Sequence, residues 1–80
     1  LDDAKKAQSA EDALTLYRRL LAINGVDAVS IYRLMAELYV AQEDPTGAVD
    51  VLTEGFDATG DESLAELRKD YVRQFAEAFL

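Results

Sequence analysis

Apolar positions recur along this chain with a period of 35 residues. Segments 10–25 and 45–60 carry the same pattern of apolar side chains, and each ends on a glycine. A fixed period of this size is typical of stacked pairs of helices rather than of a self-contained catalytic fold. The matching pairs are Ala13 with Ala48, Leu14 with Val49, Leu16 with Val51, Tyr17 with Leu52, Leu21 with Phe56, and Gly25 with Gly60.

The spacing of apolar residues, together with capping and breaking residues, predicts an all-α chain. Ser9, Asp27 and Asp44 are suited to cap the N-termini of three helices, and Asp61 or Glu62 opens another. Side chains of this kind accept hydrogen bonds from the free N–H groups of a first helical turn. The sequence therefore predicts four helices, at about 10–23, 28–42, 45–58 and 62–79.

The second predicted helix is apolar around most of its circumference. Its polar residues Ser30, Arg33 and Glu37 are spaced so that they form one narrow stripe. A helix of this kind is buried on most sides, so we expect it at the centre of the fold. In the third predicted helix, Gly55 costs about 1 kcal/mol relative to Ala, which predicts a close contact with another helix at that point.

Composition excludes several classes of function. The 80 residues, half of them hydrophobic, can form one small packed domain. The formal net charge is −8, and no basic residue lies between Arg33 and Arg68. We therefore expect no nucleic-acid partner, because phosphate binding needs clustered Lys and Arg. No apolar run approaches the roughly 20 residues that span a bilayer, so we expect no membrane insertion.

Two residue types that carry much of protein chemistry are missing from the chain. It has no Cys and no His, which removes thiol chemistry, the commonest general base and the commonest metal ligand. The Asp and Glu side chains could still act as acids or bases, but acid–base catalysis needs them in a cleft. Here they occupy positions that are expected to be exposed. We therefore expect no enzyme activity, no metal site and no cofactor.

The stretch from Tyr32 to Gly60 resembles one tetratricopeptide repeat, a helix–turn–helix unit of about 34 residues. The motif is present as Tyr32-x2-Met35-Ala36-x2-Tyr39, followed by Ala48-x3-Leu52-x2-Gly55. Met35-Ala36 replaces the usual Leu-Gly, and Gly60 stands where Pro is common. Residues 8–25 and 61–80 look like halves of neighbouring repeats, so we expect the chain to be part of a longer helical repeat protein. An ordinary four-helix bundle is the alternative fold.

The resemblance implies a non-catalytic protein–protein interaction module, a scaffold or an adaptor. In this family the first helix of each pair lines a concave groove that holds an extended or helical peptide. By this resemblance, the residues expected to face the groove are Ser30, Arg33, Glu37, Val40 and Ala41.

Acidic residues on the third predicted helix indicate a second candidate surface. Asp50, Glu54 and Asp57 recur at helical spacing and form an acidic face. This face would favour a basic partner, although such a charge pattern is also typical of an ordinary solvated surface.

The apolar end of the chain is the candidate surface for a structural function. Tyr71, Phe75, Phe79 and Leu80 form an edge that is more apolar than a free terminus usually is. The alternative function is therefore self-assembly into homo-oligomers through this edge, unless these residues fold back on the other helices.

A third class of function depends on one serine. Asp61-Glu62-Ser63-Leu64 is similar to the Asp-Ser-Leu attachment site of acyl carrier proteins, which are also small, acidic and four-helical. The extra Glu62 interrupts that motif, and Ser63 lies much nearer the end of the chain than in that family. We therefore expect Ser63 to be an ordinary first-turn residue.

Overall fold

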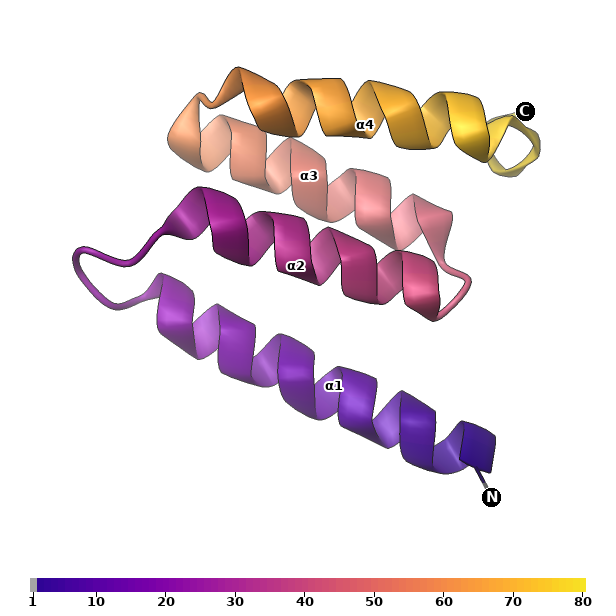
Figure 1. The fold of residues 1–80 in the computed structure, drawn as a ribbon, viewed down its shortest axis with the longest axis horizontal. Helices are drawn as coiled ribbons and strands as arrows, with labels where there is room; N and C mark the ends of the chain where they lie inside the picture. The colour runs from indigo at the N-terminus through magenta and orange to yellow at the C-terminus, as the bar shows by residue number, and fades with distance from the viewer. Residues whose placement is uncertain (1) are drawn as a thin grey trace.

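The computed structural model describes the backbone of residues 2–80, with the side chains of Lys5 and of residues 8–80. The predicted all-α fold is confirmed, since four helices pack against one another in chain order (Figure 1). Successive helices run in opposite directions and form a flat molecule of 38 × 31 × 13 Å. The helices are α1 (Asp2–Leu21), α2 (Ala28–Ala41), α3 (Pro45–Thr59) and α4 (Glu62–Gln74), followed by a short 3₁₀ helix, η1 (Ala76–Phe79).

Two of the predicted helix boundaries are wrong. Helix α1 begins at Asp2, so Ser9 lies inside it and is not its N-cap. Residues 4–8 are Ala, Lys and Gln, whose high helix propensity extends the helix toward the N-terminus. At the other end of the chain, α4 ends at Gln74 and does not reach 79. The chain turns at Phe75, so Phe79 belongs to η1 and not to α4.

The other three helices begin as predicted, each after an aspartate. In each case the carboxylate accepts a hydrogen bond from a backbone N–H of the first turn, which would otherwise have no partner. The bonds run from Ser30 to Asp27 at 3.2 Å, from Gly47 to Asp44 at 3.0 Å and from Ser63 to Asp61 at 2.8 Å.

The core is formed mainly by three of the four helices. Met35 of α2, Leu52 of α3 and Leu64 of α4 are the largest fully buried side chains. Among the described side chains of helix α1, only the small one of Ala10 is buried, and Leu16 is exposed. The apolar residues of α1 that pack half-buried against the core are Leu14, Tyr17, Leu20 and Leu21. Helices α2, α3 and α4 therefore form the packed unit, and α1 lies against one side of it.

Helices α2 and α3 approach closely where tyrosines meet glycines. A Cβ placed on Gly55 would lie 2.6 Å from Cγ of Tyr32, and one placed on Gly47 would lie 2.6 Å from Cδ1 of Tyr39. Real Cβ atoms do not come this near to another atom. The close helix contact predicted at Gly55 is therefore confirmed, and two tyrosine–glycine contacts set the register of the pair.

Candidate functional site

The polar stripe predicted on the second helix lies on the outside of α2. Arg33, Glu37 and Ala41 are exposed, whereas Ser30 and Val40 are half-buried. We call these five residues the α2 stripe.

One exposed neighbour of the α2 stripe was not among the predicted site residues. The apolar side chain of Leu34 is also exposed. Its position could have been found from spacing, since Ser30, Leu34, Glu37 and Ala41 follow one another at intervals of four, three and four residues.

Ser30, at one end of the α2 stripe, takes part in helix capping. Its backbone N–H and its hydroxyl both donate to Asp27, and the Oγ–Oδ2 distance is 2.7 Å. These hydrogen bonds stabilise the ionised carboxylate and lower the pKa of Asp27 below its ordinary value of 3.8. Ser30 therefore has less capacity to contact a ligand than the exposed members of the stripe.

Arg33 and Glu37 border helix α4. Hydrogen bonds from Ser63 are the main cause of the lowered pKa of Asp61, the cap of α4, and the positive charge of Arg33 lowers it further. Burial is the main cause of the raised pKa of Tyr71 on α4, and the negative charge of Glu37 adds to it. Among the described side chains, neither Arg33 nor Glu37 forms a salt bridge. The stripe thus presents two charges beside α4 that are available to a partner.

Helix α3 carries the predicted acidic face, but one of its three residues is engaged within the protein. Glu54 forms a salt bridge with Arg18 of α1 and accepts a hydrogen bond from the hydroxyl of Tyr32 at 3.3 Å. The hydrogen bond from Arg18 is the main cause of the lowered pKa of Glu54. All three acidic residues are exposed, but Arg18 balances the charge of Glu54. The unbalanced acidic charge available to a basic partner is therefore that of Asp50 and Asp57.

The shifted carboxyl groups make stability depend on pH in a definite direction. Because the folded-state pKa of Glu54 lies below 4.5, its stabilising contribution is present above that pH and is lost as the pH falls through the folded value. We expect Glu54→Gln to lower the free energy of unfolding at about pH 7, and the difference from the wild type to shrink at an acidic pH below 4.5. Urea denaturation followed by circular dichroism at both pH values measures this difference.

The matched control for this prediction is Asp57→Asn, which removes an exposed carboxylate from the same helix. Its effect should stay within about 0.5 kcal/mol at both pH values. If Glu54→Gln costs the same stability at both pH values, the charge of Glu54 does not contribute to the link between α1 and α3.

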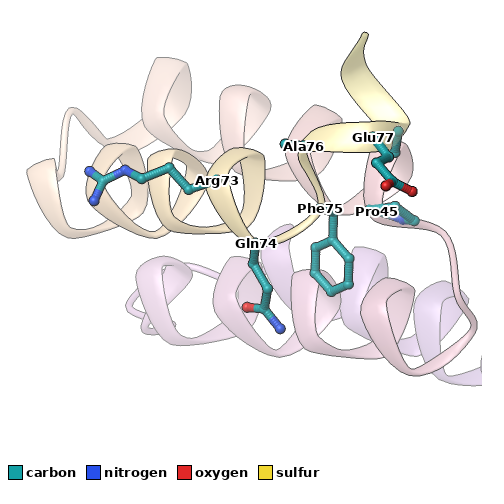
Figure 2. A pocket seen from close by; sticks show the side chains of 7 residues that line it. Pro45, Arg73, Gln74, Phe75, Ala76 and Glu77 are labelled. Atoms are coloured by element: carbon teal, nitrogen blue, oxygen red, sulfur yellow. The ribbon is translucent and has the colours of Figure 1, made fainter.

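The predicted oligomer edge is folded against the start of α3. Tyr71, Phe75 and Phe79 are half-buried, and Leu80 is fully exposed. The rings of Tyr71 and Phe75 lie 6.2 Å apart. Phe75 and Pro45 both line a hollow of about 410 Å³, and their side chains lie near one another (Figure 2). Most of the apolar surface that motivated the edge is thus covered by the chain itself, and assembly through it stays a prediction.

Three other functions were considered: group attachment at Ser63, metal binding and membrane insertion. The described part of the chain offers little structural support for any of them. Ser63 donates its hydroxyl to Asp61 at 2.6 Å, as an ordinary first-turn residue does. Among the described residues, no cluster of carboxylates could hold a metal ion. None of the described helices combines the length and the apolar character that a membrane span requires.

Comparison with known proteins identified no relative of this chain. A function must therefore be inferred from the residues described above. No family model matches the sequence, and neither the curated proteins nor the solved structures include a similar protein.

Proposed function

We propose that this chain is a non-catalytic protein–protein interaction module that binds a peptide along the α2 stripe, as the tetratricopeptide resemblance implies. One observation supports the proposal above others. Helix α2 packs against α1, α3 and α4, yet it leaves Arg33, Leu34 and Glu37 exposed in a row. A central helix with charged and apolar side chains exposed between its neighbours can contact a partner along its length.

The charges around the α2 stripe indicate which peptide would bind. Arg33 lies near two capping carboxylates, those of Asp27 and Asp61, and Glu37 adds a third negative charge one helical turn further along. Negative charge therefore exceeds positive charge on this surface, while Leu34 offers an apolar contact. We propose a basic peptide that carries an apolar residue, because complementary charge favours the correct partner and its orientation.

Peptide selection followed by charge reversal tests this proposal. Peptides are selected from a phage-displayed random library on the immobilised chain, and their affinities are measured by fluorescence anisotropy. We expect the selected peptides to be rich in Lys and Arg. Glu37→Lys should weaken their binding about tenfold or more, since it places like charges opposite one another. Asp50→Lys makes the same charge change on α3 and should leave the affinity within about twofold.

The contrary results are equally specific. A selection that yields no saturable binder would show that the α2 stripe is not a peptide site. Binding that is lost in Asp50→Lys and retained in Glu37→Lys would place the peptide on the acidic surface of α3 instead.

A further inference from the structure

Helices α2 and α4 run in the same direction and contact one another directly (Figure 1). Each begins after an aspartate cap, Asp27 in α2 and Asp61 in α4. The lowered pKa of Asp61 is caused mainly by hydrogen bonds from Ser63, and the negative charge of Asp27 acts on it in the opposite direction. The two caps therefore lie near each other, and residues at equal distances from them lie at similar levels along the two helices.

This register brings Tyr71 of α4 level with Glu37 of α2, since each is the tenth residue of its helix. The charges agree with the register. Burial is the main cause of the raised pKa of Tyr71, and the negative charge of Glu37 adds to it. The contact between the two helices, their common register and this effect of charge all place the carboxylate of Glu37 beside Tyr71.

The two side chains differ in character and in freedom. Glu37 is exposed, and it forms no salt bridge with any described side chain. Tyr71 is half-buried against the core, and its ring lies 6.2 Å from that of Phe75. Leu67, one turn earlier on the same side of α4, is half-buried as well. An unpaired carboxylate thus lies beside an aromatic ring held by its neighbours, with an apolar side chain next to the ring.

We propose that Glu37 and Tyr71 form a subsite for an arginine side chain of the peptide that binds along the α2 stripe. The proposal rests on the proposed function and deepens it, because it adds α4 to the site and names the residue that is recognised. The guanidinium group of arginine can make two parallel hydrogen bonds to a carboxylate. Its planar face stacks on an aromatic ring, and its methylene chain can pack on an apolar side chain such as Leu67.

Lysine matches this subsite less well than arginine does. Its ammonium group is a compact, strongly hydrated charge, which cannot pair with both oxygens of Glu37 in a fixed plane or stack on Tyr71 as a plane. Arg33 lies one turn before Glu37 on α2, so its charge disfavours a second cation beside the first. We therefore expect one arginine at a defined position of the peptide, while lysine suffices at its other basic positions.

The peptides selected from the random library test the subsite through their own sequences. The peptide that binds most tightly is synthesised with each arginine in turn replaced by lysine, and fluorescence anisotropy gives the affinity of each version for the intact chain. At one position we expect the replacement to weaken binding about tenfold, because the paired hydrogen bonds and the stacking are lost together. At the other basic positions the change should stay within about threefold.

Variants of the chain locate this arginine preference. Tyr71→Leu should weaken binding of the original peptide about fivefold or more and remove its advantage over the lysine version, whereas Tyr71→Phe keeps the ring and should keep the preference. Tyr17→Leu is the matched control, since Tyr17 of α1 is also half-buried against the core, and it should leave the affinity within about twofold.

An exposed position gives a second test in case Tyr71→Leu does not fold, which circular dichroism would show. Glu37→Gln should also remove the arginine preference, because the amide cannot accept two hydrogen bonds from a guanidinium group. Asp70→Asn removes an exposed carboxylate that precedes Tyr71 in the sequence, and it should leave the preference intact.

Failure of the subsite can be distinguished from failure of the proposed function. A chain that binds none of the selected peptides contradicts both. Peptides that bind, and that Glu37→Lys weakens, support the proposed function. The subsite is then overturned if lysine replaces every arginine without loss of affinity, or if folded Tyr71→Leu and Glu37→Gln variants keep the full preference for arginine.

Discussion

Replacing Leu52 with Ala is expected to lower the free energy of unfolding by about 3 kcal/mol. Leu52 is fully buried in α3, the helix that packs on both α2 and α4. Removal of its side chain leaves a cavity between three helices that cannot all move inward together. A domain of this size has a total stability of about 4–12 kcal/mol, so the loss would be a large share of it.

Urea denaturation followed by circular dichroism measures the loss, and Leu16→Ala is its matched control. Leu16 is also a leucine in a helix, but it is more than half exposed. Its truncation should therefore change the free energy of unfolding by about 0.5 kcal/mol or less. Similar losses for the two variants would mean that the outer side of α1 is buried in solution, as it would be if copies of the chain associated through it.

Local signals in the sequence were sufficient to predict most of the helices. Aspartates capped three of them as expected, because capping depends on the short-range bonding of a carboxylate to nearby N–H groups. Gly55 was predicted to mark a close helix contact because its cost to the helix needs a compensating contact. The start of α1 was predicted wrongly because Ser9 is a residue type that often caps helices. In the structure Ser9 lies inside α1, in a segment with high helix propensity.

Local sequence signals could not predict the end of α4 or the salt bridge between Glu54 and Arg18. The apolar spacing through Phe75 and Phe79 fits a continuing helix, whereas in the structure the chain turns at Phe75 and η1 packs against α3. Arg18 and Glu54 are 36 positions apart, so no pattern within one helix connects them. The 35-residue period could have indicated this pair, since it makes α1 and α3 equivalent helices with similarly oriented side chains.

Three polar residues of the sequence predicted the exposed side of α2, and two of them, Arg33 and Glu37, are exposed in the structure. Leu34 was not expected to be exposed, because a large apolar residue in a mostly apolar helix is usually buried. Burial depends on where neighbouring helices end, and the pattern of a single helix does not contain that information. The exposed leucine changes the proposed ligand, because it adds a large apolar contact beside the charges of Arg33 and Glu37.

Gly55→Ala is expected to destabilise the protein by about 2 kcal/mol, although Ala is the better helix former by about 1 kcal/mol. The new Cβ would lie 2.6 Å from Cγ and 2.9 Å from Cβ of Tyr32. These two atoms are close to the backbone of α2, so a change of side-chain rotamer cannot move both of them away. The helices must therefore separate, and the buried contacts on either side of Tyr32 must loosen with them.

Thermal and urea unfolding of Gly55→Ala, compared with Asp57→Ala, separates this overpacking from helix propensity. Asp57 lies two residues further along α3 and is exposed, so its replacement gains propensity without a new contact. We expect Asp57→Ala to change the free energy of unfolding by about 0.5 kcal/mol or less, and Gly55→Ala to lower it clearly. A Gly55→Ala variant as stable as the wild type would show that α2 and α3 do not depend on close approach at this glycine. The register set by Tyr32 and Gly55 would then lose its physical basis.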